Sequence, residues 1–441
     1  MESSDDRSVR AVSTDAPSAS GNPADTSRLS KVVAAPPKKH LAVVTMGVKL
    51  GDETRGYTRF RFLSGFLVQQ GFEVDLITSS FQHWEKQQRD TSKACYRDLP
   101  YRVVFIDEPG YTRNLDMKRI RSHAVAAKNM RDYFRAHAGE YDLIYCEIPP
   151  NDVARACAEA AQEQGIPFVA DINDLWPEAM RMVFNVPVVS SVLYHPFARD
   201  AHIVYNLLTA AVGTSDEYAA RPAADRTRPY PKETVYVGND LAAFDAGVAA
   251  HADEVDKPQD QIWAIYTGTL GASYDLDTLI CASVPTKRAV PGFRVKILGD
   301  GPDREKLQKR ASDLHAPVDF LGYVDYPVMA AYLSKADITV NSLVKEAPQS
   351  IVTKIGDYLA AGKPLVNTGS SLEFRTKVDA DGFGVNVEAE DARALANALI
   401  WLAKAKDQRK IMGVRARRIA EQQFDQPHSY LKIVNLIRSL I

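Results

Sequence analysis

Short apolar runs alternate with helix-like stretches along most of the chain. The runs are rich in Val, Ile, Leu and aromatic residues and are bounded by Gly, Pro, Asp or Asn, which is typical of strands. Between them, apolar residues recur at helical spacing. The strand-like runs are 40–46, 72–79, 101–107, 141–147, 166–172, 207–213 and 233–239, followed by 262–270, 293–301, 317–323, 336–343, 364–369 and 383–388.

The strand, helix, strand order predicts an α/β fold with parallel sheets that carry helices on both faces. Residues 241–260 are polar and Ala-rich and lack a strand-like run, so we interpret them as a linker between two doubly wound, Rossmann-like domains. The domains are predicted at 40–240 and 261–422, with terminal helical residues 423–441. Residues 1–39 are rich in Ser, Ala, Asp and Pro, which predicts a disordered tail.

Composition narrows the class of protein. The chain has 441 residues, 45% hydrophobic and 25% charged, with a net charge of −2, so no bulk attraction to nucleic acid is expected. Cys95, Cys146, Cys157 and Cys281 are scattered without metal-ligand spacing, which predicts buried free thiols in a reducing compartment. No apolar run is long enough to span a membrane, and the first residues lack the pattern of a signal peptide. We therefore expect a cytoplasmic protein.

The segment "EAPQSIVTKIGDYLAAGKPLV" (346–366) predicts a loop, a short helix and the start of a strand. Ser350 is the expected N-cap and Gly362 the expected stop. Ser350, Lys354 and Asp357 then share one helix face, at i, i+4 and i+7. A helix N-terminus favours an anion, and Lys354 adds charge there. The alternative is an ordinary core helix with an exposed Lys354–Asp357 pair.

Glycine turns follow several strands of the second series. They lie at Gly268 and Gly271, at Gly299 and Gly301, and at Gly322. Glycine lets backbone N–H groups approach a phosphate or a base closely. Such turns are common in α/β proteins, but together they favour a nucleotide. No Walker A sequence is present and no GxGxxG follows a strand, which argues against an NTPase and a dinucleotide site.

Two segments of the first domain carry candidate chemistry. "GDETRGYTRFRF" joins a strand to a helix, with Gly51 and Gly56 for flexibility and Arg55, Arg59 and Arg61 as cations that could close over a diphosphate. The alternative is a solvated basic helix start.

"ADINDLWPEAM" (170–180) places Asp171, Asp174 and Glu178 after a strand, and Glu147 ends the preceding strand. These carboxylates can bind sugar hydroxyls or assist a proton transfer. The alternative for Asp174 is helix capping. Nothing fits a nucleophilic triad, and His83, His123, His195, His202 and His315 are taken as structural.

A family is recognisable in these motifs. "ILGDGPDREKL", "FLGYVDYPVMAAYLSKADITV" and "KIGDYLAAGKPLV" resemble the family-4 retaining glycosyltransferases, which transfer sugars from nucleotide sugars and have the GT-B fold. "DINDLWPE" resembles the branch that builds bacterial surface polysaccharides. The resemblance covers about residues 40–441 and implies a terminal helix, 423–441, that crosses back to the first domain.

The resemblance also implies roles for individual residues. Asp357 matches the family acid that holds the nucleotide ribose, while Gln349 replaces the acid that contacts the donor sugar, with Glu346 as a possible substitute. The usual Arg and Lys after the first strand of the second domain are missing, with Thr269 and Tyr274 in their region. Phosphate charge must then be met by Lys354, Lys345, the first-domain arginines or backbone amides.

Asp171 replaces the family His. The predicted catalytic residues are Asp171, Asp174, Lys354 and Gln349, and the predicted donor-binding residues are Arg55, Gly56, Gly268, Thr269, Gly299, Gly322, Tyr323, Glu346, Ser350, Ile351, Val352 and Asp357.

The implied activity is sugar transfer with retention from a nucleotide-diphosphate sugar to a glycan or lipid-linked acceptor, in capsular, exopolysaccharide or cell-wall synthesis. The transferred group would be a hexosyl or N-acetylhexosaminyl residue, and no cofactor or metal is expected. Residues 111–138 carry seven Lys/Arg against two Asp, with apolar residues at helical spacing. This helix either rests on the inner face of an anionic membrane or is a surface helix packed on its sheet. Rival functions are a nucleotide-sugar epimerase and a non-catalytic sugar-nucleotide binding protein.

Overall fold

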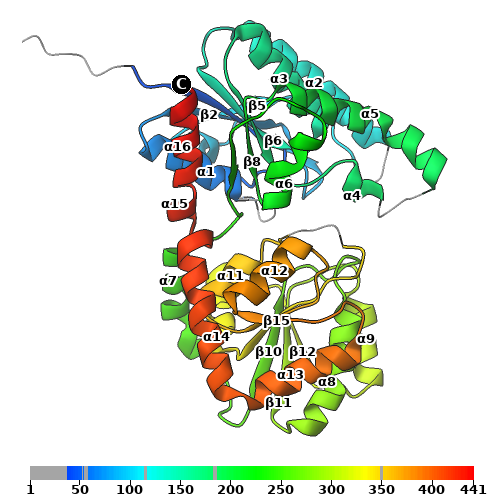
Figure 1. Cartoon of the computed structure of the whole chain (residues 1–441). Coiled ribbons are helices and arrows are strands. Elements are labelled where there is room, and N and C mark those ends of the chain that lie inside the picture. Colours follow the sequence, from blue (N-terminus) through cyan, green and yellow to red (C-terminus); the bar gives the residue numbers. More distant parts are fainter. Residues whose placement is uncertain (1–36, 52, 54–57, 114–116, 182–185, 348–350) are drawn as a thin grey trace, which may run out of the picture. The chain divides into compact units, whose positions relative to one another are not determined.

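The computed structural model describes residues 37–441 except 52, 54–57, 114–116, 182–185 and 348–350 (Figure 1). The described part contains two parallel sheets of seven and six strands and a short two-stranded ribbon. The predicted α/β class with two doubly wound domains is therefore confirmed. The predicted tail at 1–39 lies almost wholly outside the described residues.

The first sheet has the strand order β5-β2-β1-β6-β7-β8-β9. The strands β2 and β5 are added on one side of β1, and β6 to β9 on the other. The β1–β6 pair is therefore the switch point at which a crevice opens. The strands are β1 (His40–Val44), β2 (Glu73–Ser79), β5 (Arg102–Ile106), β6 (Leu143–Ile148), β7 (Phe168–Ile172), β8 (Ala210–Gly213) and β9 (Lys232–Thr234). The ribbon β3 (Phe81–Gln82) and β4 (Gln87–Gln88) follows β2.

Alternate residues of β1 explain why helices cover both faces of this sheet. Ala42 and Val44 pack with the helices α2 (Met117–Ala136), α3 (Asn151–Gln164) and α5 (Pro187–Leu207), whereas Leu41 and Val43 pack with α1 (Arg59–Gln69). Both sets are fully buried, as the period of two in a strand requires. The short helices α4 (Glu178–Arg181) and α6 (Asp216–Ala220) follow β7 and β8.

The second sheet has the order β12-β11-β10-β13-β14-β15, with its switch point between β10 and β13. Its strands are β10 (Ile262–Thr267), β11 (Phe293–Leu298), β12 (Val318–Gly322), β13 (Ile338–Asn341), β14 (Leu365–Asn367) and β15 (Gly384–Asn386). The connecting helices are α8 (Leu276–Ala289), α9 (Arg304–Asp313), α10 (Tyr326–Lys335), α11 (Ile355–Ala360), α12 (Leu372–Asp381), α13 (Ala392–Lys404) and α14 (Lys406–Ile419). Every strand predicted for this domain is present.

The stretch 241–260 is more ordered than a linker. It contains α7 (Leu241–His251), whose Leu241 and Phe244 are buried in the same core as α10 and α11. Asp240 begins this helix, because its side chain accepts a hydrogen bond from the backbone N–H of Ala243 at 3.0 Å. The Ala-rich composition that looked like a spacer therefore encodes a helix of the second domain's core.

The chain ends with α15 (Gln426–Ser429) and α16 (Leu431–Leu440). Ile433, Val434 and Ile437 of α16 are buried in the core that contains β1 and α1 of the first domain. The return of the terminal helix to the first domain, implied by the family resemblance, is thus present.

All four cysteines are free, with Cys146 and Cys157 buried and Cys95 and Cys281 half-buried. Within the described ranges, no helix combines the length and the apolar character needed to cross a bilayer.

Candidate functional site

The first candidate site lies at the carboxyl ends of β10 and β13, where the second sheet reverses. Helix α11 begins at Ile355, with Lys354 as its N-cap residue. The predicted helix start at Ser350 is therefore wrong, because residues 351–354 form a bend and a turn ahead of the helix. Lys354 and Asp357 consequently do not share one exposed face. The alternative, an exposed ion pair between these two side chains, is not observed.

Lys354 points into the domain rather than toward solvent. Its side chain is only 8% exposed, and its Nζ atom lies 3.9 Å from the ring centre of Tyr266 and 4.0 Å from that of Tyr274. In the described part of the chain, Nζ has no hydrogen-bond partner. Burial holds the pKa of this amine well below its usual range. A buried cation without a counter-charge is costly, so this geometry favours an anionic ligand.

Asp357 is turned the other way, toward the segment that joins the two domains. Its Oδ1 accepts hydrogen bonds from Asn239 Nδ2 at 2.9 Å and from the Tyr326 hydroxyl at 2.9 Å. Burial raises the pKa of Asp357 to about 6, although both hydrogen bonds oppose the shift. At neutral pH the group is an oriented carboxylate, with Oδ2 available to accept hydrogen bonds from ligand hydroxyl groups.

The predicted glycine turns are closely packed at the same edge. Gly268 follows β10 with φ +132°, and a Cβ at this position would lie 2.9 Å from the Lys354 Nζ atom. Gly299 follows β11 with φ +137°, and a Cβ there would overlap the carbonyl oxygen of Gly268. Only glycine fits either position. Gly322 ends β12 with the guanidinium group of Arg304 beside it, 3.6 Å from where a Cβ would stand.

The remaining predicted donor residues differ in their availability. Thr269 and Glu346 are exposed, and Tyr323 is 71% exposed just after β12. Ile351 is half-buried. Val352 is buried in the domain core, so its side chain is not free to bind a ligand. Arg55, Gly56, Gln349 and Ser350 lie outside the described residues.

The second candidate site is a cavity of about 160 Å³ in the first domain. It is lined by Met46 and Gly47 after β1 and by Glu147 at the end of β6, so it lies at the switch point of the first sheet. The loop after β7 contributes Asp174 and Trp176, as predicted for Asp174. Other lining residues are His83, Trp84, Glu108, Tyr111, Arg119 and His123.

Glu147 has a carboxylate oxygen that remains available in this cavity. Its Oε2 accepts hydrogen bonds from Thr45 Oγ1 at 2.5 Å and from the Met46 backbone N–H at 3.3 Å, whereas Oε1 receives neither. Burial raises the pKa of Glu147 to about 7, the charge of Asp171 adds to the shift, and the Thr45 hydrogen bond opposes it. Glu108 differs because both of its oxygens accept serine hydroxyl groups, from Ser79 at 2.5 Å and from Ser122 at 2.7 Å.

Aromatic residues on one side of the cavity surround the guanidinium group of Arg119. The Arg119 guanidinium lies 4.9 Å from the ring centre of Trp176 and 5.4 Å from that of Tyr111. Burial lowers the pKa values of His83 and His123 to about 3, so both imidazoles are neutral at pH 7. Both histidines, which the sequence suggested were purely structural, thus line a cavity. Burial also raises the pKa of Asp174, whose oxygens accept the Leu175 N–H and the Trp176 indole N–H.

Asp171 does not reach either site, and its predicted catalytic role is not supported by its position. The carboxylate is fully buried and pairs with Arg59, Nε to Oδ2 at 3.1 Å and Nη2 to Oδ1 at 3.2 Å. Tyr145 donates its hydroxyl to Oδ2 at 2.7 Å. Arg59, predicted to meet a diphosphate, is committed to this pair and to the carbonyl oxygens of Val235 and Tyr236.

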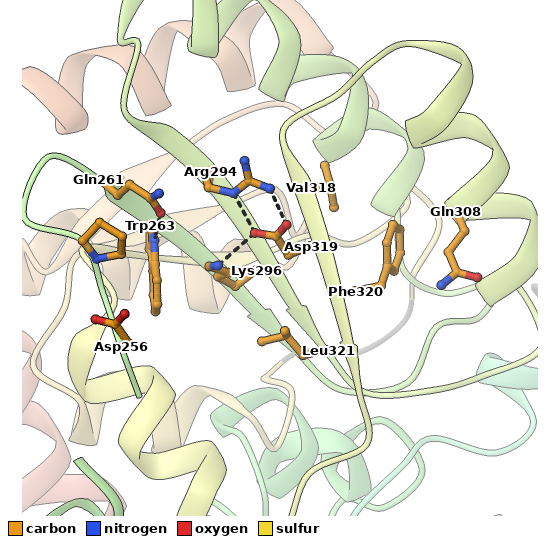
Figure 2. Close-up of a pocket in the computed structure, with 11 residues that line it drawn as sticks. Asp256, Gln261, Trp263, Arg294, Lys296, Gln308, Val318, Asp319, Phe320 and Leu321 are labelled. Carbon is orange, nitrogen blue, oxygen red and sulfur yellow. Dashed lines mark hydrogen bonds and ion pairs between the residues drawn. The ribbon is translucent and has the colours of Figure 1, made fainter. Parts of the chain in front are cut away.

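A third hollow can be excluded as the donor site on charge and position (Figure 2). It is lined by Trp263, Arg294 and Lys296, near the amino ends of β10 and β11, whereas ligands of such sheets bind at the carboxyl ends. Asp319 also neutralises both cations, since its Oδ2 accepts Arg294 Nε at 2.7 Å and Lys296 Nζ at 2.8 Å.

Comparison with known proteins finds a similarity in the second domain. Residues 262–405 match the family model described as glycosyl transferases group 1. A search of curated proteins gave no match.

Among solved structures, sucrose-phosphate synthase from Thermosynechococcus elongatus is 17% identical with a TM-score of 0.67, covering 91% of this chain and 99% of its own. The Anabaena protein HepE, solved in complex with UDP, is 16% identical with a TM-score of 0.67, covering 91% and 100%. The fold is GT-B.

WaaG, described as a glycosyltransferase involved in lipopolysaccharide biosynthesis, is a further GT-B neighbour at 13% identity and a TM-score of 0.60, covering 89% of this chain and 99% of its own. The family match and these neighbours support a glycosyltransferase. HepE has also been solved in complex with UDP-glucose.

Sequence reasoning missed several residues around the first candidate site. Tyr266 and Tyr274 enclose Lys354, but the sequence places Tyr266 within a strand-like run and Tyr274 only in the region of the missing Arg and Lys. Arg304 lies within "ILGDGPDREKL", so its place directly after a glycine turn was a usable signal. Asn239 and Tyr326 are far from Asp357 in sequence, and no local pattern predicts those hydrogen bonds.

Proposed function

We propose that the chain is a retaining glycosyltransferase that moves a sugar from a nucleotide-diphosphate sugar to a glycan or lipid-linked acceptor. The observation that carries the proposal is the buried Lys354 amine, which has no hydrogen-bond partner among the described residues and lies beside the Gly268 turn at the switch point of the second sheet. A diphosphate is a ligand that offers this amine a counter-charge at the carboxyl end of the sheet, where ligands of such folds bind.

The second domain would then bind the donor. Lys354 and the backbone N–H groups of the 268–270 and 299–301 turns meet the diphosphate, and Asp357 accepts hydrogen bonds from the ribose hydroxyls. The exposed ring of Tyr323 offers the base a surface to stack on. Gln349, Ser350 and the backbone of Ile351 remain proposals for sugar and phosphate contacts.

The cavity of the first domain is the proposed acceptor site. Its volume of about 160 Å³ is below the roughly 300 Å³ of the smallest drug-sized pockets, so it suits one sugar ring rather than a longer segment. Oε1 of Glu147 and the side chain of Asp174 offer hydrogen-bond acceptors to sugar hydroxyls, with Trp84 and Trp176 as apolar walls.

In the retaining mechanism the leaving diphosphate takes the proton of the attacking hydroxyl, so no dedicated base is required. The protein stabilises the negative charge that develops on the diphosphate and holds the acceptor in position. We assign no metal or cofactor a role in this scheme. The pathway we favour is the synthesis of a capsular, exo- or cell-wall polysaccharide.

A lipid-linked acceptor is favoured by apolar side chains next to the acceptor cavity. In α2, Ala127 and Met130 are buried against the sheet, but Met117 is 73% and Ile120 41% exposed. Val189, Val192 and Leu193 are exposed near the start of α5. Trp176, which stacks on His123 of α2 and meets Phe197 of α5 edge-on, connects the two helices. With the basic residues of α2, these side chains suit an anionic membrane surface.

Sedimentation with anionic liposomes at low salt tests this membrane contact. We expect binding that decreases as salt is added, since the attraction is partly electrostatic. A protein that stays in the supernatant at low salt contradicts it.

A thermal-shift screen with UDP, GDP, UDP-sugars and GDP-sugars tests the proposed function as a whole. We expect one nucleotide to stabilise the protein and Asp357→Ala to abolish the shift. Release of the nucleoside diphosphate with an acceptor present then distinguishes a transferase from a binding protein, which shows no turnover, and from an epimerase, which consumes donor without an acceptor. A folded protein that binds no nucleotide contradicts the proposal.

A further inference from the structure

We propose that Lys354 is an uncharged amine in the free protein and becomes an ammonium ion when the donor diphosphate binds, so that donor binding takes up one proton. The inference rests on the proposed function and specifies the state in which the donor site meets its ligand. It begins from the position of the amine, which is buried between two tyrosine rings and has no hydrogen-bond partner within the part of the chain that the structure describes.

The elements around Lys354 offer it no negative charge. On β10 and the loop after it, the Tyr266 hydroxyl donates to the Thr269 carbonyl oxygen at 2.8 Å, and burial raises the pKa of Tyr274. On α11, the Tyr358 hydroxyl accepts the Thr267 backbone N–H at 2.8 Å, and burial raises its pKa. These three tyrosines are therefore neutral at pH 7.

The carboxylates of the neighbouring segments interact with other groups. Asp357 accepts hydrogen bonds from Asn239 and Tyr326, and Asp275 Oδ1 accepts one from the Thr278 backbone N–H at 3.1 Å, while Asp275 Oδ2 has no hydrogen-bond partner among the described residues. Asp300 after β11 pairs with Arg304 at 3.4 Å. Lys345 and Glu346, in the loop after β13, are exposed. None of them forms an ion pair or hydrogen bond with Lys354 among the described residues.

The two opposing effects on the amine differ in size. Contact with the faces of Tyr266 and Tyr274 favours the ammonium form, but a cation–π contact is a modest interaction. Removal of an ammonium ion from water without a counter-ion opposes it more strongly. Lysines buried in this way lose their proton near or below neutral pH.

A bound diphosphate reverses this balance because it brings negative charge next to the amine. The Nζ atom is buried, but it lies 2.9 Å from where a Cβ of Gly268 would stand at the carboxyl end of β10, so a small movement of the lysine side chain would bring it to a diphosphate bound at this turn. The amine then takes a proton from solvent and pairs with a phosphate oxygen. A nucleoside without phosphates brings no such charge and binds without a proton.

Titration calorimetry of the full chain tests this, with UDP, GDP, ADP and inorganic pyrophosphate as probes at pH 7.5. Each titration is run in buffers of different ionisation enthalpy, so that the slope of the observed heat gives the number of protons taken up. We expect about one proton per diphosphate bound, an affinity that weakens by up to about tenfold per pH unit above neutrality, and no uptake with uridine or guanosine.

Three variants identify the group that takes the proton. Lys354→Met has no amine, so uptake disappears and affinity no longer depends on pH. Lys354→Arg is charged at every pH and also binds without uptake. Asp357→Asn is the matched control on the same helix, in which the affinity for UDP falls but the uptake persists.

The outcomes separate the two proposals. If a folded protein binds none of the probes, the proposed function fails and this inference fails with it. If a probe binds with the same heat in every buffer, donor binding stands and the inference is overturned. Uptake that persists in Lys354→Met also overturns it, since another group would be the one that titrates.

Discussion

Two buried basic side chains of this protein, Arg59 and Lys354, are held in opposite ways. Arg59, in the first domain, is 2% exposed and is paired with Asp171, with the Tyr430 hydroxyl and with two carbonyl oxygens. Lys354, in the second domain, is 8% exposed and contacts two aromatic faces, but its amine has no hydrogen-bond partner among the described residues. Arg59 joins α1 to the start of α16 and therefore stabilises the fold, whereas Lys354 makes no such connection in the part of the chain that the structure describes.

The difference shows why sequence position alone was a poor guide to role. Both cations follow a strand and lie at a helix start, which is where both were expected to meet a diphosphate. Burial removes the hydration of both side chains, but only Arg59 gains an ion pair and hydrogen bonds within the protein that offset this loss. A buried ionisable group without a partner is thus the more specific mark of a binding site.

The test with the largest expected effect breaks the ion pair between Arg59 and Asp171. Asp171→Ala leaves Arg59 buried and unpaired, so the free energy of unfolding should fall by about 3–5 kcal/mol. Urea denaturation followed by circular dichroism measures it. The double variant Arg59→Met, Asp171→Leu should lose less than the single variant, because no unpaired charge remains. A loss below about 1 kcal/mol in Asp171→Ala would mean that the pair is not structural.

The second test removes the buried amine of Lys354. Lys354→Met should lower kcat/KM for the donor by about 100-fold, the effect of one charge-stabilising contact, without reducing stability. Initial rates of nucleoside diphosphate release measure this. Lys345→Met is the control, and a smaller effect is expected there because its exposed charge is screened. Equal effects of the two substitutions would remove the special role of Lys354.

The third test separates the ribose from the diphosphate. Asp357→Asn keeps the shape but loses the charge that accepts ribose hydroxyls, so the affinity for UDP should fall by about tenfold, or 1.4 kcal/mol. Pyrophosphate, which has no ribose, should bind both proteins alike. A parallel loss for the two ligands would mean that Asp357 acts on the diphosphate.

The most gradual effect is a difference in how stability depends on pH. The pKa of Lys354 is lowered in the folded protein, so the unfolded chain binds more protons between that pKa and about 10.4, and stability rises with pH in this window. Wild type should therefore gain about 1.4 kcal/mol relative to Lys354→Met for each pH unit between pH 7 and pH 9. Denaturation midpoints of both proteins at several pH values measure this, and parallel curves would contradict an uncharged amine.

The sequence predicted most of the fold. Every predicted strand of both domains is present, although the run at 233–239 yields only the three residues of β9. Buried parallel strands read as continuous apolar runs, which is a strong local signal. Helix boundaries are weaker, because α11 begins at Ile355 and not near Ser350 once Val352 packs into the core.

The candidate site was less predictable, because its geometry depends on contacts between distant segments. Lys354, Gly268 and Asp357 were named from their patterns, and the structure brings Lys354 and Gly268 together. The aromatic enclosure by Tyr266 and Tyr274, and the Arg59–Asp171 pair across 112 residues, arise only from the tertiary fold. A carboxylate after a strand can face either a cleft or a buried arginine, and residue type does not tell these apart.

A crystal structure of the full chain with UDP tests the central claim most directly. We expect the diphosphate at the Gly268 and Gly299 turns with an oxygen about 2.7–3.2 Å from the Lys354 Nζ atom and the ribose within hydrogen-bond distance of Asp357. A nucleotide bound elsewhere, or one bound at this edge while Lys354 stays between Tyr266 and Tyr274 without contacting it, would contradict the claim.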